Sequence, residues 1–159
     1  MATQPRPTEY PSLMTRNSGF FSLVAMIGVL SSPLAAQSKD FTIIVNASNP
    51  VASLPRDDVA KLFLKKTVTW SSGQAVAPVE LPATAKARVD FARDVLNKSV
   101  GQVKSYWQQQ IFSGRDVPPP EKQSENDVVA FVRSNPGAIG YVSKGVQIGR
   151  GVKPLAVEP

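Results

Sequence analysis

The sequence predicts an α/β fold in which helices flank a mixed, partly parallel sheet. Short runs rich in β-branched residues alternate with helical patterns along residues 41–157, and this alternation is typical of a layered α/β protein. The chain has 159 residues, of which 42% are hydrophobic and 19% charged, so it can form one folded domain of ordinary size. Its 14 prolines predict many turns.

The predicted elements follow from the position of apolar residues, proline, glycine and capping residues. The first half reads as a strand at 41–45, a loop at 46–53, a helix from 54 to 66, and two extended segments at 67–70 and 75–81 around a turn at Gly73. The second half reads as helices over 82–98, 100–112 and 124–134, a strand at 138–142, a loose loop at 145–151 and a last strand at 152–157.

Several local signals define the ends of these elements. A stripe of Val89, Ala92, Val95 and Leu96 predicts the buried face of the helix at 82–98. Ser124 with an acidic residue three positions later resembles a capping box, and Asn135-Pro136-Gly137 suits a type II turn that ends the same helix.

The N-terminus has the layout of a secretory signal peptide. Residues 20–30 form an apolar run, Arg16 precedes it, and small residues ending in Ala35 and Ala36 follow it. The run is shorter than the roughly 20 residues that a membrane span needs. We therefore predict a signal peptide over 1–36, cleaved after Ala36 or Gln37, and a periplasmic location, with an uncleaved anchor as the alternative. Met14 would give an n-region of ordinary length, which suggests that translation starts there.

Composition excludes most enzymatic mechanisms. The chain has no Cys and no His, so the usual zinc sites, thiol nucleophiles and Ser-His-Asp relays are not available. Asp57 and Asp58 are adjacent and suit the start of a helix, and Asp90 with Asp94 has no third ligand beside it. We expect no enzymatic activity, no metal and no cofactor.

The charge of the chain favours an anionic partner. Of its 18 basic and 12 acidic residues, only Arg6, Arg16 and Glu9 precede position 37, which leaves a net charge of +5 on residues 37–159. Such a field attracts anions, although a simple solvated surface is the alternative. We expect no nucleic-acid partner, because an exported protein meets little nucleic acid and the sequence contains no aromatic and basic RNA motif.

Two loops are candidates for anion binding, since ligands of open α/β sheets sit beyond the carboxyl ends of strands and near helix N-termini. The first follows the first strand and offers Asn46, Ser48 and Asn49. The second starts the helix at 82–98 and offers Thr84, Lys86 and Arg88. The alternative for the second loop is that Thr84 caps the helix while both cations are solvated.

The order of these motifs resembles that of the phosphate-binding group of type 2 periplasmic binding proteins. The matching segments cover nearly all of residues 37–159. They are the run from Val45 to Leu54, Leu62-Phe63-Leu64 with Lys66-Thr67, Trp70 and Gly73, Val76 with Pro78-Val79, Tyr106-Trp107 with Ile111-Phe112 and Gly114, and above all Asn135-Pro136-Gly137-Ala138-Ile139-Gly140-Tyr141-Val142.

This resemblance implies that residues 37–159 are a periplasmic-binding-protein-like domain, a single lobe of the type 2 fold. It implies an exported, non-enzymatic solute-binding role related to phosphate or oxyanion transport by an ABC transporter. Phosphate or another small anion is then the expected ligand, and a membrane transporter or sensor is the expected protein partner, with a homodimer also possible. The alternative is an interaction or sensor-accessory module of the cell envelope with no small-molecule ligand.

The sequence departs from the family at the phosphate site. The resemblance implies an Arg and a Ser-Gly-Thr turn between strand and helix, but here residues 80–88 read Glu-Leu-Pro-Ala-Thr-Ala-Lys-Ala-Arg. The glycine that permits close backbone approach is replaced, and Glu80 lies where positive charge would help. Lys65 also stands where the family commonly has glycine. We therefore expect the fold to match that of the family more closely than the ligand-binding site does.

Overall fold

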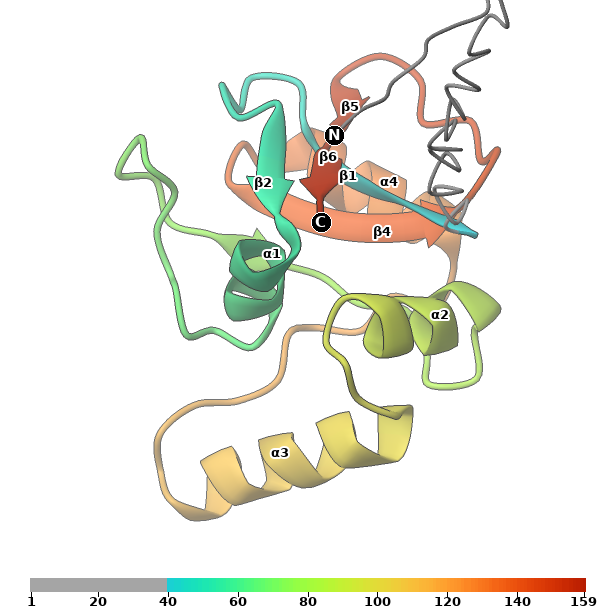
Figure 1. Cartoon of the computed structure of the whole chain (residues 1–159). Helices are drawn as coiled ribbons and strands as arrows, with labels where there is room; N and C mark the ends of the chain where they lie inside the picture. Colours follow the sequence, from blue (N-terminus) through green and yellow to red (C-terminus); the bar gives the residue numbers. More distant parts are fainter. Residues whose placement is uncertain (1–39) are drawn as a thin grey trace, which may run out of the picture. The chain divides into compact units, whose positions relative to one another are not determined.

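The computed structural model describes residues 40–159 (Figure 1). The predicted signal peptide at 1–36 lies outside the described residues. Within residues 40–159 no helix is long and apolar enough to cross a bilayer.

Two sheets organise the fold. The larger has the strand order β3-β4-β1-β5 and contains β1 (Phe41–Asn46), β3 (Ala77–Pro78), β4 (Ala138–Ser143) and β5 (Val152–Pro154). β1 pairs antiparallel with β4 and β5, with Ile43 opposite Tyr141, while β3 runs parallel to β4. The smaller sheet joins β2 (Ser53–Pro55) in parallel to β6 (Ala156–Glu158). The predicted mixed sheet is confirmed.

Helices cover both faces of the larger sheet (Figure 1). α4 (Glu125–Ser134) packs on β1, β4 and β5, and a Cβ at Gly140 would come within 2.7 Å of Val128 on that helix. Side chains alternate along a strand, so the next residue, Tyr141, faces the opposite layer. There it meets side chains of α1 (Arg56–Phe63) and α2 (Lys86–Asp94).

Four aromatic rings form the centre of that second layer. The rings of Phe91 and Tyr141 stack with centroids 4.1 Å apart, Phe63 packs 4.6 Å from Phe91, and Phe41 meets Phe91 edge to face at 5.7 Å. All four side chains are buried. Aromatic contacts of this kind add to the free energy of burial, so they hold α1 and α2 firmly on the sheet.

The helix α3 (Val100–Phe112) packs on α2 and lies further from the sheet (Figure 1). It begins with a full capping box, in which the Ser99 side chain accepts from the Gln102 backbone and the Gln102 side chain accepts from the Ser99 N–H. Val103 and Trp107 are buried, and the Tyr106 hydroxyl donates to the carbonyl of Leu64 just after α1.

Most predicted elements are confirmed, with corrections at their ends. The first helix begins at Arg56 rather than at 54, and α2 begins at Lys86 rather than at 82–84. Ala85 is the N-cap of α2 and makes no side-chain cap, so Thr84 does not cap this helix. Val89 is 45% exposed because Phe91 and Ala87 form the buried face in its place. The last predicted strand is interrupted at Leu155.

The turn at 135–137 is present but is not type II. Ala138 N–H donates to the Asn135 carbonyl, yet Gly137 does not have the positive φ that type II requires. Glycine is needed here for another reason, because a Cβ at Gly137 would lie 2.1 Å from the carbonyl oxygen of Ala75. The predicted cap at Ser124 is confirmed, since its hydroxyl accepts from the Asp127 N–H.

Candidate functional site

The predicted site residue Arg88 lies inside the protein. It is 6% exposed and forms an ion pair with Glu80, which is 4% exposed and lies at the end of the segment that contains β3. A guanidinium Nη1 also donates to the Tyr141 hydroxyl at 3.1 Å, and the Leu81 N–H donates to the same hydroxyl at 3.4 Å. We call Glu80, Arg88 and Tyr141 the Arg88 cluster.

Burial controls the ionisation of the Arg88 cluster. Desolvation raises the pKa of Glu80, and the nearby charge of Arg88 only partly offsets that shift. Burial alone would lower the pKa of Arg88, but attraction to Glu80 and Tyr141 outweighs it and raises this pKa. Desolvation also raises the pKa of Tyr141, so the phenol stays protonated. The positive charge of Arg88 is therefore already compensated inside the fold.

The other two residues of the predicted cradle at the start of α2 are exposed. Thr84 lies in the turn before the helix. The Lys86 ammonium donates to Asp40 at 2.8 Å and to Asp90 at 2.6 Å. These hydrogen bonds raise the pKa of Lys86, and the bond from Lys86 lowers the pKa of Asp90. An anion at this helix start would compete with two carboxylates for the same ammonium.

The Asn46 side chain has a structural role. Its amide donates to the carbonyls of Val132 and Arg133 at 2.9 Å each, and both belong to the last turn of α4. Its oxygen accepts from the backbone N–H and the hydroxyl of Ser48. Asn49 is 2% exposed and accepts from the Val51 N–H, while its Nδ2 has no partner within the described part of the chain. Of the three predicted residues of this loop, only Ser48 is exposed.

The structure does not bring the two predicted loops together. Lys86 contacts Asp40, which immediately precedes β1, whereas Asn46 is the last residue of β1. Six residue steps along a strand span about 20 Å. The six predicted residues therefore form two groups at opposite ends of one strand, and they cannot hold one small anion jointly.

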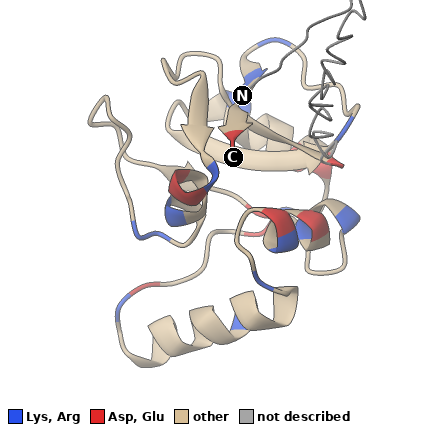
Figure 2. Ribbon diagram, in the orientation of Figure 1, with Lys and Arg blue, Asp and Glu red and all other residues tan. Residues whose placement is uncertain are grey.

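A cavity of about 750 Å³ lies beside the Arg88 cluster, and we call it the α3 cavity. Residues of α3, the connector at 117–121 and the pair Glu80 and Arg88 line it. The connector is held to the sheet edge, because Glu80 N–H donates to the Pro120 carbonyl and Lys122 N–H donates to the Glu80 carbonyl. Figure 2 shows charges of both signs along α2, while α3 carries Lys104 alone.

Two residues that line the α3 cavity, Trp107 and Arg88, each have a buried donor with no acceptor among residues 40–159. Trp107 is 4% exposed, and its indole N–H makes no hydrogen bond in the described part of the chain. The Nε of Arg88 is also buried and unpartnered there. By contrast, the indole of the other tryptophan, Trp70, donates to the Gly137 carbonyl at 2.9 Å. The sequence predicts a helix over 100–112, which includes Trp107, but no sequence signal marks the indole N–H of this residue as unpaired.

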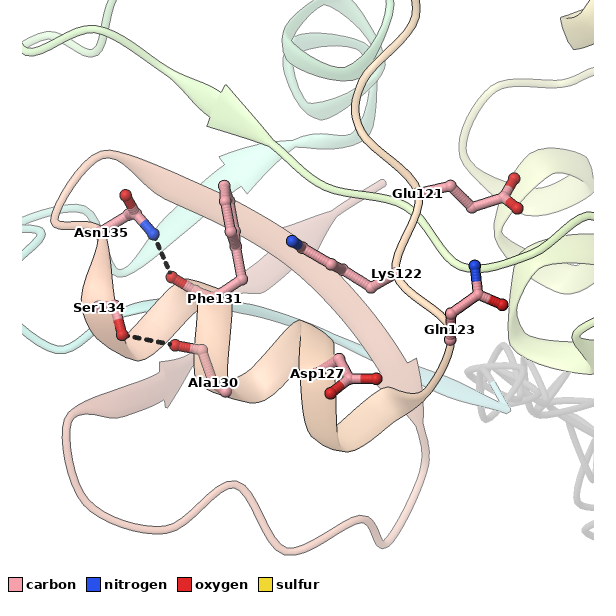
Figure 3. Close-up of a pocket in the computed structure, with 8 residues that line it drawn as sticks. All are labelled: Glu121, Lys122, Gln123, Asp127, Ala130, Phe131, Ser134 and Asn135. Carbon is pink, nitrogen blue, oxygen red and sulfur yellow. Dashed lines mark hydrogen bonds between the residues drawn. The ribbon is translucent and has the colours of Figure 1, made fainter.

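A second hollow, of about 560 Å³, lies between the connector and α4 (Figure 3). Its polar groups are largely used within the protein, since the Ser134 hydroxyl donates to Ala130 and the Asn135 amide donates to Phe131. The Lys122 ammonium lies 4.9 Å from the centre of the Phe131 ring. This hollow offers less to a ligand than the α3 cavity does.

Three solved structures share the backbone arrangement of this chain. An ABC-type phosphate transport receptor from Vibrio cholerae matches it with a TM-score of 0.56 and 22% identity, over 74% of this chain and 46% of its own. A putative phosphate ABC transporter substrate-binding protein from Clostridium perfringens, with bound phosphate, matches with a TM-score of 0.58 and 19% identity, over 74% of this chain and 44% of its own. PstS from Borrelia burgdorferi matches with a TM-score of 0.59 and 16% identity, over 74% of this chain and 47% of its own.

The chain has the periplasmic binding-protein fold. It spans less than half of the length of each of these three proteins, which is consistent with a single lobe. No protein-family profile matches the sequence, and neither does any protein of curated function. At identities of 16–22% the likeness to these binding proteins concerns the fold and not the ligand.

Proposed function

We propose that this chain is a non-enzymatic solute-binding domain of the cell envelope, related to the phosphate and oxyanion receptors of ABC transporters. The observation that carries the proposal is the backbone match to three such receptors over 74% of the chain. Within residues 40–159 there is no cluster of His, Cys, Asp and Glu that could hold a metal ion.

Any anion affinity would centre on the start of α2, where Thr84 and Lys86 are exposed. A free helix N-terminus attracts anions, and Lys86 adds an exposed cation. The affinity is expected to be weak, because Asp40 and Asp90 already bind Lys86 while Glu80 already binds Arg88. The loop with Asn46, Ser48 and Asn49 would have to act independently of this site.

Calorimetric titration with inorganic phosphate tests this binding. We expect weak, millimolar binding by the wild type, its loss in Lys86→Ala, and its retention in the matched control Lys66→Ala, which removes an exposed lysine elsewhere. Heat that is equal in all three proteins, or no heat at tens of millimolar phosphate, would remove the phosphate ligand from the proposal. The fold assignment would be unaffected.

Export is the second part of the proposal, and it rests on the apolar run at 20–30 followed by Ala35 and Ala36. Mass spectrometry of protein recovered from the periplasm should give a chain that starts at Gln37 or Ser38. Recovery of an uncleaved chain in the membrane fraction would favour an anchor instead.

One observation favours the alternative, an interaction module with no small-molecule ligand. Large apolar side chains are exposed at the end of α3 and in the following connector, where Phe112 is 90%, Val117 59% and Ile111 50% exposed. A photo-crosslinking residue at position 112 should then capture one envelope protein in living cells, and excess phosphate should not change the yield. If the crosslinking yield at position 112 were no higher than that from a control at Gln109, this surface would be excluded as an interaction site.

A further inference from the structure

The exposed face of α3 carries little charge (Figure 2). Lys104 is its only ionisable residue, and the other exposed positions are glycine, serine and glutamine, followed by Ile111 and Phe112 at the C-terminal end. Charged residues make up 19% of the whole chain, so a helix of 13 residues with one charge is poor in them. The cores of protein interfaces are likewise depleted of charge and enriched in aromatic residues. This composition is typical of a surface that another protein covers.

An apolar projection and an apolar hollow lie next to each other on this face. Phe112 is 90% exposed, whereas Gln108 and Ile111, in the turn before it, line the α3 cavity. Residues four apart on a helix are neighbours, so Phe112 stands beside Gln108 at the rim of the cavity. Ile111, Val117 and the prolines at 118–120 make much of the lining apolar. A face that has both a projection and a hollow can be complementary to a copy of itself.

Two opposite charges on the lining of the α3 cavity have no ionic partner within residues 40–159. Lys104 belongs to α3 and Glu121 to the connector, and both are exposed. None of the ion pairs among the described residues includes either of them. The other two charges of the lining pair with each other inside the Arg88 cluster. Glu121 is held in place, because the connector is hydrogen-bonded to Glu80 on both sides of it.

A two-fold axis through this face would bring the two unpaired charges together. In a symmetric dimer, each contact between two different residues occurs twice, once in each direction. Lys104 of each copy would meet Glu121 of the other, so one patch would supply two ion pairs. Complementary charges of this kind select the partner and its orientation more than they add affinity. A second copy of the chain has the required charges without any further assumption.

We propose that the face around the α3 cavity binds a second copy of this chain. Phe112 of each copy enters the α3 cavity of the other, and Lys104 pairs with Glu121 across the interface in both directions. This inference goes beyond the solute-binding function and does not depend on it, since it uses no residue at the start of α2. It also assigns one definite partner to the surface that the alternative function leaves to another envelope protein.

Analytical ultracentrifugation of the full-length protein measures this association. We expect a monomer–dimer equilibrium with a dissociation constant of about 10–100 μM, since a patch on one helix and one connector is small for a specific interface. Phe112→Ser should weaken the dimer at least about tenfold, because a buried aromatic anchor contributes much of the binding energy. The matched control Val68→Ser removes a side chain that is 56% exposed and lies outside the cavity lining. This control should leave the constant unchanged.

Charge reversal identifies the partner and its orientation. Lys104→Glu or Glu121→Lys alone places like charges opposite each other in both halves of the interface, so each variant should dimerise at least about tenfold more weakly. An equimolar mixture of the two variants should recover the wild-type constant, because one copy then presents two acidic side chains and the other two basic ones. The double variant on one chain exchanges both charges and should also dimerise like the wild type.

Three results would overturn the proposal. The first is a protein that stays monomeric at about 500 μM. The second is a dimer that Phe112→Ser and both charge reversals leave unchanged, as association through the apolar run at 20–30 would be. The third is a mixture of the two charge variants that associates no more tightly than each alone. Loss of phosphate binding in Lys86→Ala bears only on the proposed anion function, and loss of the dimer bears only on this interface.

Discussion

Glu80 and Arg88 form an ion pair inside the fold, with Glu80 only 4% and Arg88 only 6% exposed. Glu80 follows β3, and Arg88 lies in the first turn of α2, so the pair fastens the start of this helix to the sheet edge. An arginine that could otherwise bind an anion is thereby used in the structure. A buried pair of this kind is costly to break, although it need not stabilise the protein relative to an apolar pair.

This ion pair predicts that substitutions at its two positions have strongly non-additive effects on the free energy of unfolding. Arg88→Met leaves the Glu80 carboxylate buried without its partner, and Glu80→Met leaves Arg88 in the same state, so each should lower the free energy of unfolding by about 3–5 kcal/mol. The double variant removes both charges, so its free energy of unfolding should fall by less than that of either single variant. Urea denaturation of the four proteins measures the coupling. Additive losses would show that the two side chains do not interact.

The raised pKa of Glu80 predicts a specific pH dependence of stability. A carboxyl group whose pKa is higher in the folded than in the unfolded protein stabilises fully below the unfolded value, and this contribution decreases as pH rises through the folded value. The difference in unfolding free energy between wild type and Glu80→Gln should therefore shrink as the pH rises from acid to neutral. Urea denaturation at several pH values between about 3 and 7 measures it.

Asp90 is the matched control with the opposite sign. A hydrogen bond from Lys86 lowers its pKa, so its contribution is present above the unfolded pKa and is lost as pH falls through the folded value. The difference between wild type and Asp90→Asn should grow as the pH rises over the same range. Parallel slopes for the two variants would contradict the assigned directions.

The fold was largely predictable because its determinants are local. The strands at 41–45 and 138–142 are apolar runs with few alternatives, and the helix at 124–134 carries its own cap at Ser124. Errors fall where tertiary packing overrides local preference. Phe91 in place of Val89 faces the core because it stacks on Tyr141, which lies 50 residues away in the sequence.

The candidate site was less predictable, because its character depends on distant contacts. Thr84, Lys86 and Arg88 read as an open anion cradle, but only the fold places Asp40 beside Lys86 and Arg88 against Tyr141. Asn46 resembles a ligand-binding loop residue until the last turn of α4 is placed next to it. Periodicity cannot distinguish a paired from an unpaired donor, so the missing partner of the Trp107 indole N–H was not predictable.

Two glycines should respond in opposite ways to substitution by alanine. A Cβ at Gly137 would clash with the Ala75 carbonyl oxygen, which is backbone and cannot move alone, and would disturb the Gly137 carbonyl that binds Trp70. Gly137→Ala should therefore lower the free energy of unfolding by about 3 kcal/mol. Gly101 lies in a helix with open space beside it, so Gly101→Ala should raise the free energy of unfolding by about 0.5 kcal/mol. Thermal denaturation of both variants decides, and a stable Gly137→Ala protein would contradict the close approach.

Asn46 joins β1 to the C-terminal end of α4, and its replacement tests whether this role is structural. The amide satisfies the carbonyls of Val132 and Arg133, which have no further turn of helix to bind them. Asn46→Ala removes both donors and should lower the free energy of unfolding by about 2–3 kcal/mol. The control Ser48→Ala, at an exposed hydroxyl, should cost less than about 1 kcal/mol.

Asn46→Asp makes the test sharper, because it keeps the shape of the side chain and removes its ability to donate. At neutral pH a carboxylate would face two carbonyl oxygens at the negative end of the α4 dipole, so this variant should be at least as unstable as Asn46→Ala. Urea denaturation at pH 7 measures the order of the variants. If Asn46→Asp kept wild-type stability, the bonds to α4 would contribute nothing, and Asn46 would be free to act as a ligand-binding residue.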